Sequence, residues 1–454
     1  MARIHPHLES ATDDAPIDSA VSARSVARSR WSIVVLFFGY CLALQVAWAL
    51  IHPPYGIADE PAHVVKAVAT GSGQLRGPEV IGQFDYPAME YSVPEAYAGI
   101  WNFVCANDLS QTPGCAEVLS SSKERVAVSS TAANYPPLYY ASVGWAGLPF
   151  PGPVGFYSMR VLNALLVSAL AACCGWIALR STKPTLFMAA LFAAFTAQVA
   201  AFGGSVNPQA PEIAAALLFW LGGVALAHGM IAADAERTTR VLFVTAAIAF
   251  ASIRPASFVW MVPSAMVILA SSVQPSTWRE LWTDSSHRFV TLVSAAAVAL
   301  SGLWHVAFTR NVNLGGNAAV GGSLIDNLRI SFDHSDEFFM QMFGFFGWTS
   351  FYPPLVVPIL GVCAVVLLVV ASGSRKSRWS LVVFGLLLAA VVLAPTVLEG
   401  ARAARRVGDS RVVTSCPLQS GFRSWQSPSG RRHRPRYATS GWRSGRSSLR
   451  FRPM

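Results

Sequence analysis

The stretch WSIVVLFFGYCLALQVAWALI, Trp31–Ile51, decides the fold class. It carries no charged side chain, and about 20 consecutive apolar residues are enough for one helix to cross a bilayer. Arg24, Arg28 and Arg30 precede it, and no small-residue cleavage motif follows it. A basic flank before a long apolar run is typical of an uncleaved signal anchor whose N-terminus is cytoplasmic.

The composition of the whole chain also indicates a membrane protein. Of 454 residues, 53% are hydrophobic and 13% charged, against roughly 25% charged in soluble domains. Further apolar runs predict an all-α, polytopic protein with about nine transmembrane helices. These runs lie at about 156–179, 184–203, 210–232, 239–253, 256–273, 289–309, 354–371 and 379–398. Arg254-Pro255 separates two short runs, which form either two tilted helices or a re-entrant hairpin.

Basic residues near the ends of the apolar runs predict the topology. They fall on alternate connections, so all of them are cytoplasmic if the N-terminus is cytoplasmic. The long polar segments 52–155 and 310–353 are then external loops. We expect a disordered N-terminus over 1–30, a membrane domain over 31–398 and a disordered Arg-rich tail over 399–454. The basic residues that set this orientation are Arg180, Lys183, Arg237, Arg240, Arg279, Arg288, Arg375, Lys376 and Arg378.

The positive charge of the chain is concentrated in its tail. The net charge is +10, but 13 of the 34 basic and 2 of the 24 acidic residues lie in 399–454, so the remainder carries −1. The membrane domain is therefore not basic, and we expect a lipid bilayer but no nucleic acid as its partner. A basic tail outside the cytoplasm opposes the usual charge bias of membrane proteins.

Two cysteines, Cys105 and Cys115, lie in the first external loop. Disulfides form readily outside the cytoplasm, so this pair is either a disulfide bridge or two free thiols. Cysteines inside the apolar runs serve as small apolar residues.

The sharpest cluster of chemical groups is Asp59-Glu60-Pro61-Ala62-His63, directly after the first apolar run. Asp59, Glu60 and His63 can converge on one face of a helix. A carboxylate there can take a proton from an acceptor hydroxyl or hold a divalent metal ion. The same residues also form a typical helix start, with Asp59 as N-cap and Pro61 in the first turn. Both interpretations stay open, because a capped helix can still present its side chains.

Polar side chains at the ends of other apolar runs are candidate substrate ligands. Arg160 and Arg254 can bind the phosphate of a lipid-linked substrate, because a guanidinium matches phosphate geometry. They can equally extend toward lipid headgroups. Asn207 and Glu212 lie at the start of the run at 210–232, just before it and just within it, and polar groups at membrane depth are often functional.

Aromatic segments flank the predicted spans. Tyr135 and Tyr139 belong to NYPPLYY, residues 134–140, and can line a cleft for a sugar or lipid. An interfacial aromatic belt explains them as well. The segment GFFGW, residues 344–348, is either an amphipathic or re-entrant element, or part of the packed core.

Taken in order, these segments resemble the bacterial membrane proteins of the domain-of-unknown-function 2142 family. The resemblance covers about 31–400, and its most specific parts are the Asp-Glu-x-x-His and Tyr-Pro-Pro-Leu-Tyr-Tyr elements. The segments that carry it are PPYGIADEPAH (53–63), NYPPLYY (134–140), SVNP (205–208), GFFGW (344–348) and Glu399-Gly400.

That family is similar in layout to GT-C glycosyltransferases, which use lipid-phosphate sugar donors and keep an acidic residue in the first external loop. The resemblance implies Asp59 and Glu60 as catalytic or metal-binding residues. It also implies transfer of a sugar from a polyprenyl-phosphate donor to an envelope acceptor at the outer face of the bacterial plasma membrane. The alternative is a non-enzymatic transporter or flippase of a lipid-linked saccharide, with the same residues used for binding only.

The resemblance stops at Gly400, where family members continue with a Gly-Arg-Tyr-Phe-Leu-Pro-Leu type of stretch. Residues 410–422 can be back-translated with G+C-leaning codons so that another frame spells Ala-Gly-Arg-Tyr-Phe-Leu-Pro-Leu-Ala-Val-Gly. We hypothesise a frameshift near 401–409, with a genuine basic tail as the alternative. The nucleotide sequence of the gene distinguishes the two.

Overall fold

A computed structural model describes most of one compact unit, which spans residues 1–404. The predicted pair Cys105 and Cys115, the tail after 399 and nearly all of the run at 379–398 lie outside the described residues. The described residues are 15–82, 87–98, 119–255, 257–271, 283–309, 324–333, 335–344, 353–371 and the single positions 385, 389 and 393.

Four helices among the described residues contain segments long and apolar enough to cross a membrane. These helices are α1 (Ala15–Ile51), α4 (Pro153–Arg180), α7 (Gln209–Ala227) and α11 (Ser285–Thr309). A fifth candidate is the pair α5 (Pro184–Ala194) and α6 (Ala197–Gly203), which is bent by 68°. The chain is therefore a multi-pass helical membrane protein with four or five candidate spans in its described part, and the nine predicted spans stay a prediction.

Other predicted runs coincide with helices that are shorter or more polar than these candidate spans. Helices α9 (Ser257–Ser271) and α14 (Val356–Ala371) are apolar but too short to qualify as spans. Helix α8 (Glu236–Ile253) has 18 residues, but charged side chains occupy its first turns. Breaks between helices shorten them further, since a residue before proline disfavours helical backbone and Arg254-Pro255 ends α8.

Helix α1 begins earlier than the sequence indicated. Residues 1–30 were expected to be disordered, whereas the helix starts at Ala15 and continues without interruption through the signal-anchor run. Pro16 does not oppose this start, because proline is favoured in the first helical turn.

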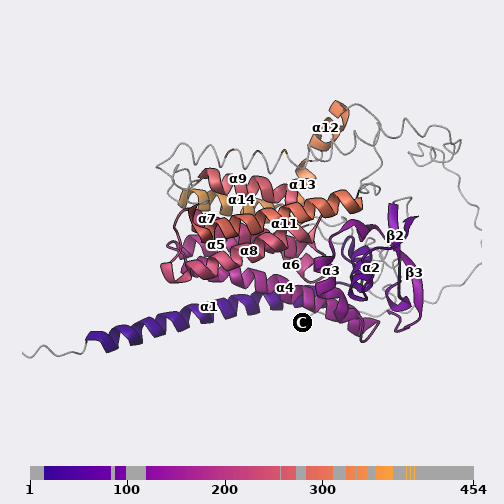
Figure 1. Ribbon diagram of the computed structural model, residues 1–454, viewed down its shortest axis with the longest axis horizontal. Helices are drawn as coiled ribbons and strands as arrows, with labels where there is room; N and C mark the ends of the chain where they lie inside the picture. The colour runs from indigo at the N-terminus through magenta and orange to yellow at the C-terminus, as the bar shows by residue number, and fades with distance from the viewer. Residues whose placement is uncertain are drawn as a thin grey trace, which may run out of the picture. The chain divides into compact units, whose positions relative to one another are not determined.

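The segment between α1 and α4 forms a polar subdomain, which we define as residues 52–152. It contains two helices and a three-stranded antiparallel sheet of order β1-β2-β3, and Figure 1 shows these elements grouped together. The all-α prediction therefore holds for the membrane helices but missed this sheet. Its elements are α2 (Glu60–Gly71), β1 (Glu79–Ile81), β2 (Pro87–Pro94), β3 (Arg125–Ser130) and α3 (Pro137–Gly144), joined by short 3₁₀ turns.

Helix α2 is buried between the sheet and α3. A Cβ atom added at Gly144 would lie 1.8 Å from the carbonyl oxygen of Ala67, so only glycine permits this close approach of α2 and α3. Lys66 is also buried on α2 and donates from Nζ to the Leu75 carbonyl at 2.8 Å and to the Tyr91 hydroxyl at 2.9 Å. These bonds fix α2 against strand β2.

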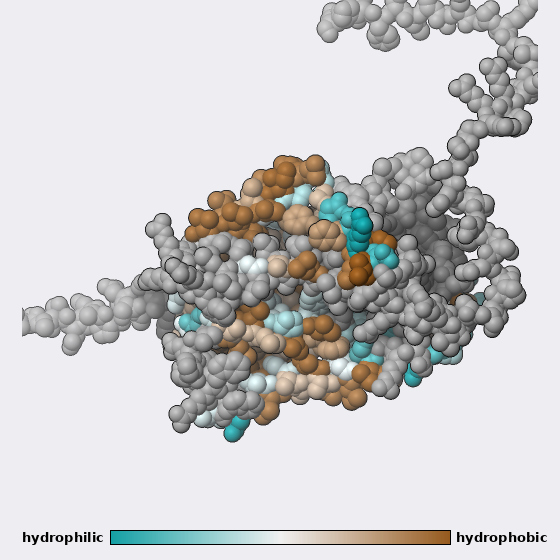
Figure 2. Space-filling view, turned by 90° about the horizontal axis from the view of Figure 1, so that it is seen from above, coloured by the Kyte–Doolittle hydropathy of each residue, from teal (hydrophilic) through white to brown (hydrophobic). Residues whose placement is uncertain are grey.

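The membrane helices expose apolar side chains over much of their surface. Leu36 on α1, Leu300 on α11 and Leu360 on α14 are 72%, 67% and 62% exposed. Figure 2 shows hydrophobic residues prevailing among the described atoms of one face. Exposed apolar surface of this extent suits a lipid environment rather than water.

Candidate functional site

Two arginine–glutamate ion pairs lie where the polar subdomain meets the membrane helices. We call Glu60 and Arg160 the sealed pair, because both side chains are fully buried. We call Asp59, His63, Tyr135, Glu212 and Arg254 the open cluster, because three of its members retain exposed surface. All of these residues come from segments that the sequence analysis identified.

Every donor of the sealed arginine is engaged. Arg160 donates from Nε to Glu60 Oε1 at 2.8 Å and from Nη2 to Glu60 Oε2 at 2.6 Å. Its other bonds reach the carbonyl oxygens of Ala49 at 2.7 Å, His52 at 2.8 Å and Pro53 at 2.9 Å. A guanidinium has five N–H donors, so none remains for a substrate.

The sealed glutamate is equally committed. Besides both contacts with Arg160, Glu60 Oε1 accepts a hydrogen bond from the backbone N–H of Val206 at 3.0 Å. The pair thereby joins the end of α1, the start of α2, helix α4 and the turn before α7. In this conformation neither side chain has access to solvent, and their arrangement is that of a structural clamp.

Asp59 occupies the N-cap position of α2 but does not cap it with its side chain. Its backbone is left-handed, with φ 64°, and its carboxylate makes no capping hydrogen bond. For a residue other than glycine this conformation costs about 1 kcal/mol or more, and such strain is concentrated at functional sites. Asp59 is also exposed to solvent, whereas the neighbouring Glu60 is buried.

The surroundings of Asp59 alter its acidity. Protein around the carboxyl desolvates it and raises its pKa, and the nearby charge of Arg254 partly offsets this increase. A carboxylate that solvent can reach and whose pKa is raised is a better proton acceptor than an ordinary surface aspartate.

Arg254 follows the last residue of α8 and is only partly engaged. It donates from Nη1 to Glu212 Oε2 at 2.9 Å, and its guanidinium lies 6.0 Å from the centre of the Tyr135 ring. Its side chain is 32% exposed. Glu212 is held in turn by Ser257, whose hydroxyl donates to Oε1 at 2.6 Å. Within the described residues, Arg254 therefore keeps donors that can bind an anion.

His63 stabilises the aromatic side of the open cluster. Its Nδ1 lies 2.8 Å from the Tyr140 hydroxyl, and its ring packs edge-on against Tyr135 with centroids 5.2 Å apart. Burial lowers the pKa of His63 to about 3, and the charge of Arg254 acts in the same direction. His63 is therefore neutral at physiological pH. Tyr139 is buried beside Tyr140 and does not reach the surface.

Asn207 positions the backbone next to Asp59. Its Nδ2 donates to the carbonyl of Ala58 at 3.3 Å, and its Oδ1 accepts from the N–H of Gln209 at 2.9 Å. Asn207 is buried, so it connects the start of α7 to the residue before Asp59 rather than facing solvent.

The residues present do not fit the predicted divalent metal site. Both oxygens of Glu60 are bound to Arg160, so Asp59 and Glu60 do not converge as a pair of ligands. In the part of the chain that the structure covers, no group of three or more His, Cys, Asp or Glu side chains is arranged to hold a metal ion.

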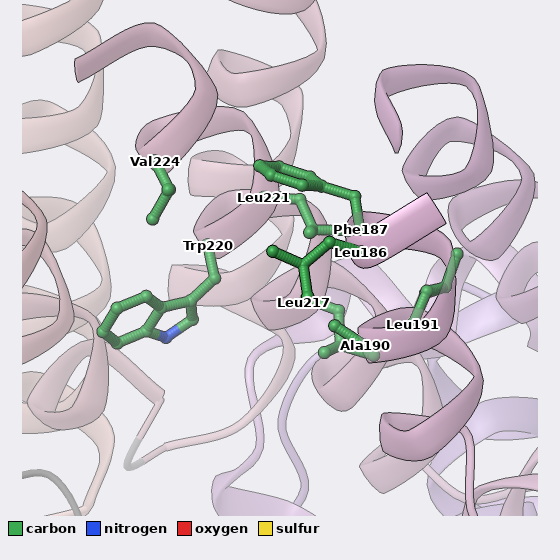
Figure 3. A pocket seen from close by; sticks show the side chains of 8 residues that line it. All are labelled: Leu186, Phe187, Ala190, Leu191, Leu217, Trp220, Leu221 and Val224. Carbon is green, nitrogen blue, oxygen red and sulfur yellow. The ribbon is translucent and has the colours of Figure 1, made fainter. Parts of the chain in front are cut away.

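A separate cavity of about 270 Å³ lies between α5 and α7. Figure 3 shows that its only labelled side chain with a polar atom is Trp220, through the indole nitrogen. The cavity contains no titratable group, so it offers space for apolar groups but no catalytic chemistry. Its lining residues are Leu186, Phe187, Ala190, Leu191, Leu217, Trp220, Leu221 and Val224.

The structure thus brings Asp59, His63, Tyr135 and Arg254 into one cluster, although they lie in three distant segments. Glu212 was noted for its position at the end of a run, and the structure identifies it as the partner of Arg254. Ser257 carried no sequence signal, because an isolated serine at the start of an apolar helix is unremarkable in composition.

The comparisons with known proteins agree with the fold. The sequence profile of a family described as "Predicted membrane protein (DUF2142)" matches residues 42–404. No curated protein and no solved structure matches the sequence. The matched region includes the sealed pair, the open cluster and the described membrane helices from α4 onward. The chain therefore belongs to the DUF2142 family of predicted membrane proteins.

Proposed function

We propose that the open cluster transfers a sugar from a polyprenyl-phosphate donor to a hydroxyl of an envelope acceptor. The observation that carries this proposal is an accessible Asp59 carboxyl of raised pKa beside a partly exposed Arg254 that keeps free donors. In this proposal the protein lies in the bacterial plasma membrane, with a cytoplasmic N-terminus and an external polar subdomain.

Arg254 provides the binding site for the phosphate. Guanidinium–phosphate hydrogen bonds are charge-assisted and match each other in geometry. Glu212 and Ser257 hold the guanidinium in place. As the bond between the anomeric carbon and the phosphate oxygen breaks, the electron pair stays on the phosphate. Arg254 stabilises the charge that develops there.

Asp59 acts as the general base. It takes the proton of the acceptor hydroxyl while the acceptor oxygen forms its bond to the anomeric carbon. The raised pKa of Asp59 favours this transfer, because a base is most effective when its pKa approaches the working pH. The reaction ends with a protonated Asp59, a glycosylated acceptor and a free polyprenyl phosphate.

The location of the cluster supports a lipid-linked substrate. Asp59 and Tyr135 belong to the polar subdomain, whereas Glu212 lies in the first turn of the candidate span α7. A phosphate attached to a membrane-embedded chain lies at such a boundary between apolar and polar layers.

The test is a transfer assay in proteoliposomes with radiolabelled undecaprenyl-phosphate glucose and an envelope polysaccharide extract. Asp59→Asn preserves the size of the side chain, and asparagine tolerates a left-handed backbone, so the variant should fold. Because an amide cannot take up the proton, we expect transfer to fall by roughly 10²- to 10⁴-fold with donor binding retained. Asp234→Asn is the matched control, because Asp234 is 71% exposed in an ion pair with Arg180.

The assay also separates the enzyme from a flippase. Movement of the labelled lipid across the bilayer is measured in the same vesicles for wild type and Asp59→Asn. If no product forms and both proteins move the lipid at equal rates, glycosyl transfer is excluded in favour of transport.

A further inference from the structure

Helix α12 (Leu324–Asp333) has two chemically distinct faces. At about 100° per residue, Ile325, Leu328 and Phe332 fall on one face. The charged side chains Asp326, Arg329 and Asp333 fall on the neighbouring side, with Arg329 at the boundary, and the exposed Ile330 lies beyond them. Ile325 and Phe332 are 75% and 55% exposed and Leu328 is partly buried, so the described part of the chain leaves most of this apolar face uncovered.

One end of α12 is connected to a lipid-exposed helix. It contacts α13 (Ser335–Gln341), and Figure 1 shows the two next to each other. Just after α13, the ring of Phe343 packs against α14 so closely that a Cβ at Gly361 would lie 2.0 Å from it. Helix α14 exposes Ile359 and Leu360 at 58% and 62%, as expected for a surface in contact with lipid.

The other end of α12 follows α11, which emerges beside the polar subdomain. Trp304 on α11 donates from Nε1 to the carbonyl of Asn134 at 3.3 Å. The Arg76 guanidinium lies 5.6 Å from the ring centre of Phe308. The C-terminal end of this candidate span therefore lies on the side of the open cluster.

We infer that α12 lies in the plane of the membrane interface, on the side of the polar subdomain, with Ile325, Leu328 and Phe332 inserted among the lipids. An amphipathic helix in this position buries its apolar face about 5–10 Å into the boundary of headgroups and acyl chains. Lipid is the occupant because α12 lies in the sequence between two apolar helices, α11 before it and α14 after α13, and its contact with α13 links it to α14. The charged face stays in contact with water and headgroups.

The test places a photoreactive benzoylphenylalanine at single positions of the full chain. The apolar positions are Ile325, Leu328 and Phe332, and Asp326 and Asp333 on the same helix are the matched controls. Each variant is reconstituted in radiolabelled phosphatidylethanolamine and phosphatidylglycerol vesicles and irradiated. We expect at least about fivefold more lipid adduct at the apolar positions.

The variant at the exposed Leu360 of α14 provides the positive control for lipid labelling. Equal lipid labelling on both faces, or no labelling while position 360 reacts, would overturn the inference. Adducts with the chain itself or with a second copy at Ile325 and Phe332 would show that protein covers this face, and would also overturn it.

Discussion

The sealed pair and the open cluster use the same residue types for different purposes. Arg160 makes five hydrogen bonds and is fully buried together with Glu60. The Arg254 guanidinium is engaged only by Glu212 and Tyr135 among the described residues and is 32% exposed. The comparison shows that the fold leaves Arg160 no donor for a substrate, whereas Arg254 keeps some, which is why only Arg254 is proposed as a ligand.

The difference follows from the position of each arginine. Arg160 projects from α4 toward the end of α1, where helix-terminal carbonyl groups lack internal partners. Arg254 lies at the break between α8 and α9, with extended backbone, and meets a single carboxylate. Backbone carbonyl groups at the end of α1 therefore accept hydrogen bonds from Arg160, whereas Arg254 has no such acceptors among the described residues.

The largest expected effect is loss of the fold when the sealed pair is broken. Glu60→Gln leaves Arg160 buried without a counter-charge, so unfolding free energy should fall by about 3–5 kcal/mol. Thermal unfolding in detergent, or the yield of monodisperse protein, measures it. Asp234→Asn removes a surface partner and should cost at most about 1 kcal/mol. A Glu60→Gln variant as stable as Asp234→Asn would contradict the structural role.

The next effect concerns the open cluster. Arg254→Gln should weaken binding of undecaprenyl phosphate by about 1.5–3 kcal/mol, the range for hydrogen bonds to charged groups, which is roughly 10- to 100-fold. Vesicle-based titration measures it. Because Glu212 would lose its partner, the double variant Arg254→Gln/Glu212→Gln serves as control. Unchanged affinity in both variants would remove Arg254 from the binding site.

A third effect is a pH-dependent loss of stability through His63. The pKa of His63 in the folded protein, about 3, lies below the ordinary value of 6.5. The contribution of neutral His63 to the unfolding free energy is therefore complete above pH 6.5. It is lost as the pH falls toward 3, because the unfolded chain binds the proton first. At pH 5 the loss is about 2 kcal/mol. His63→Leu should reduce the fall of the melting temperature between pH 6.5 and 5. If the melting temperature of the variant falls as steeply as that of the wild type, this assignment is contradicted.

The smallest expected change in stability is that of Asp59→Asn, and it distinguishes Asp59 from the adjacent Glu60. Asp59→Asn should change unfolding free energy by less than about 0.5 kcal/mol, because the Asp59 side chain caps no helix and asparagine tolerates the left-handed backbone. The same isosteric change at Glu60 should be severe. Thermal unfolding of the two variants side by side tests this, and equal losses would mean that Asp59 is also structural.

The sequence by itself determined the membrane class, the positions of most membrane helices and the segments that hold the candidate site residues. Hydropathy and capping are local properties, so they can be read within a window of about 20 residues. The same local reading placed Asp59 at the start of α2 and Arg254 after α8, as the structure has them.

Only the tertiary structure decided which carboxylate meets which arginine, and which of them solvent reaches. Arg160 lies 100 residues from Glu60 in the chain, and Arg254 lies 42 residues from Glu212. Neither pairing has a local signal, because it depends on how α2, α4, α7 and α8 pack. The sheet of the polar subdomain and the bend between α5 and α6 were also missed, since short strands and helix breaks depend on contacts made after folding.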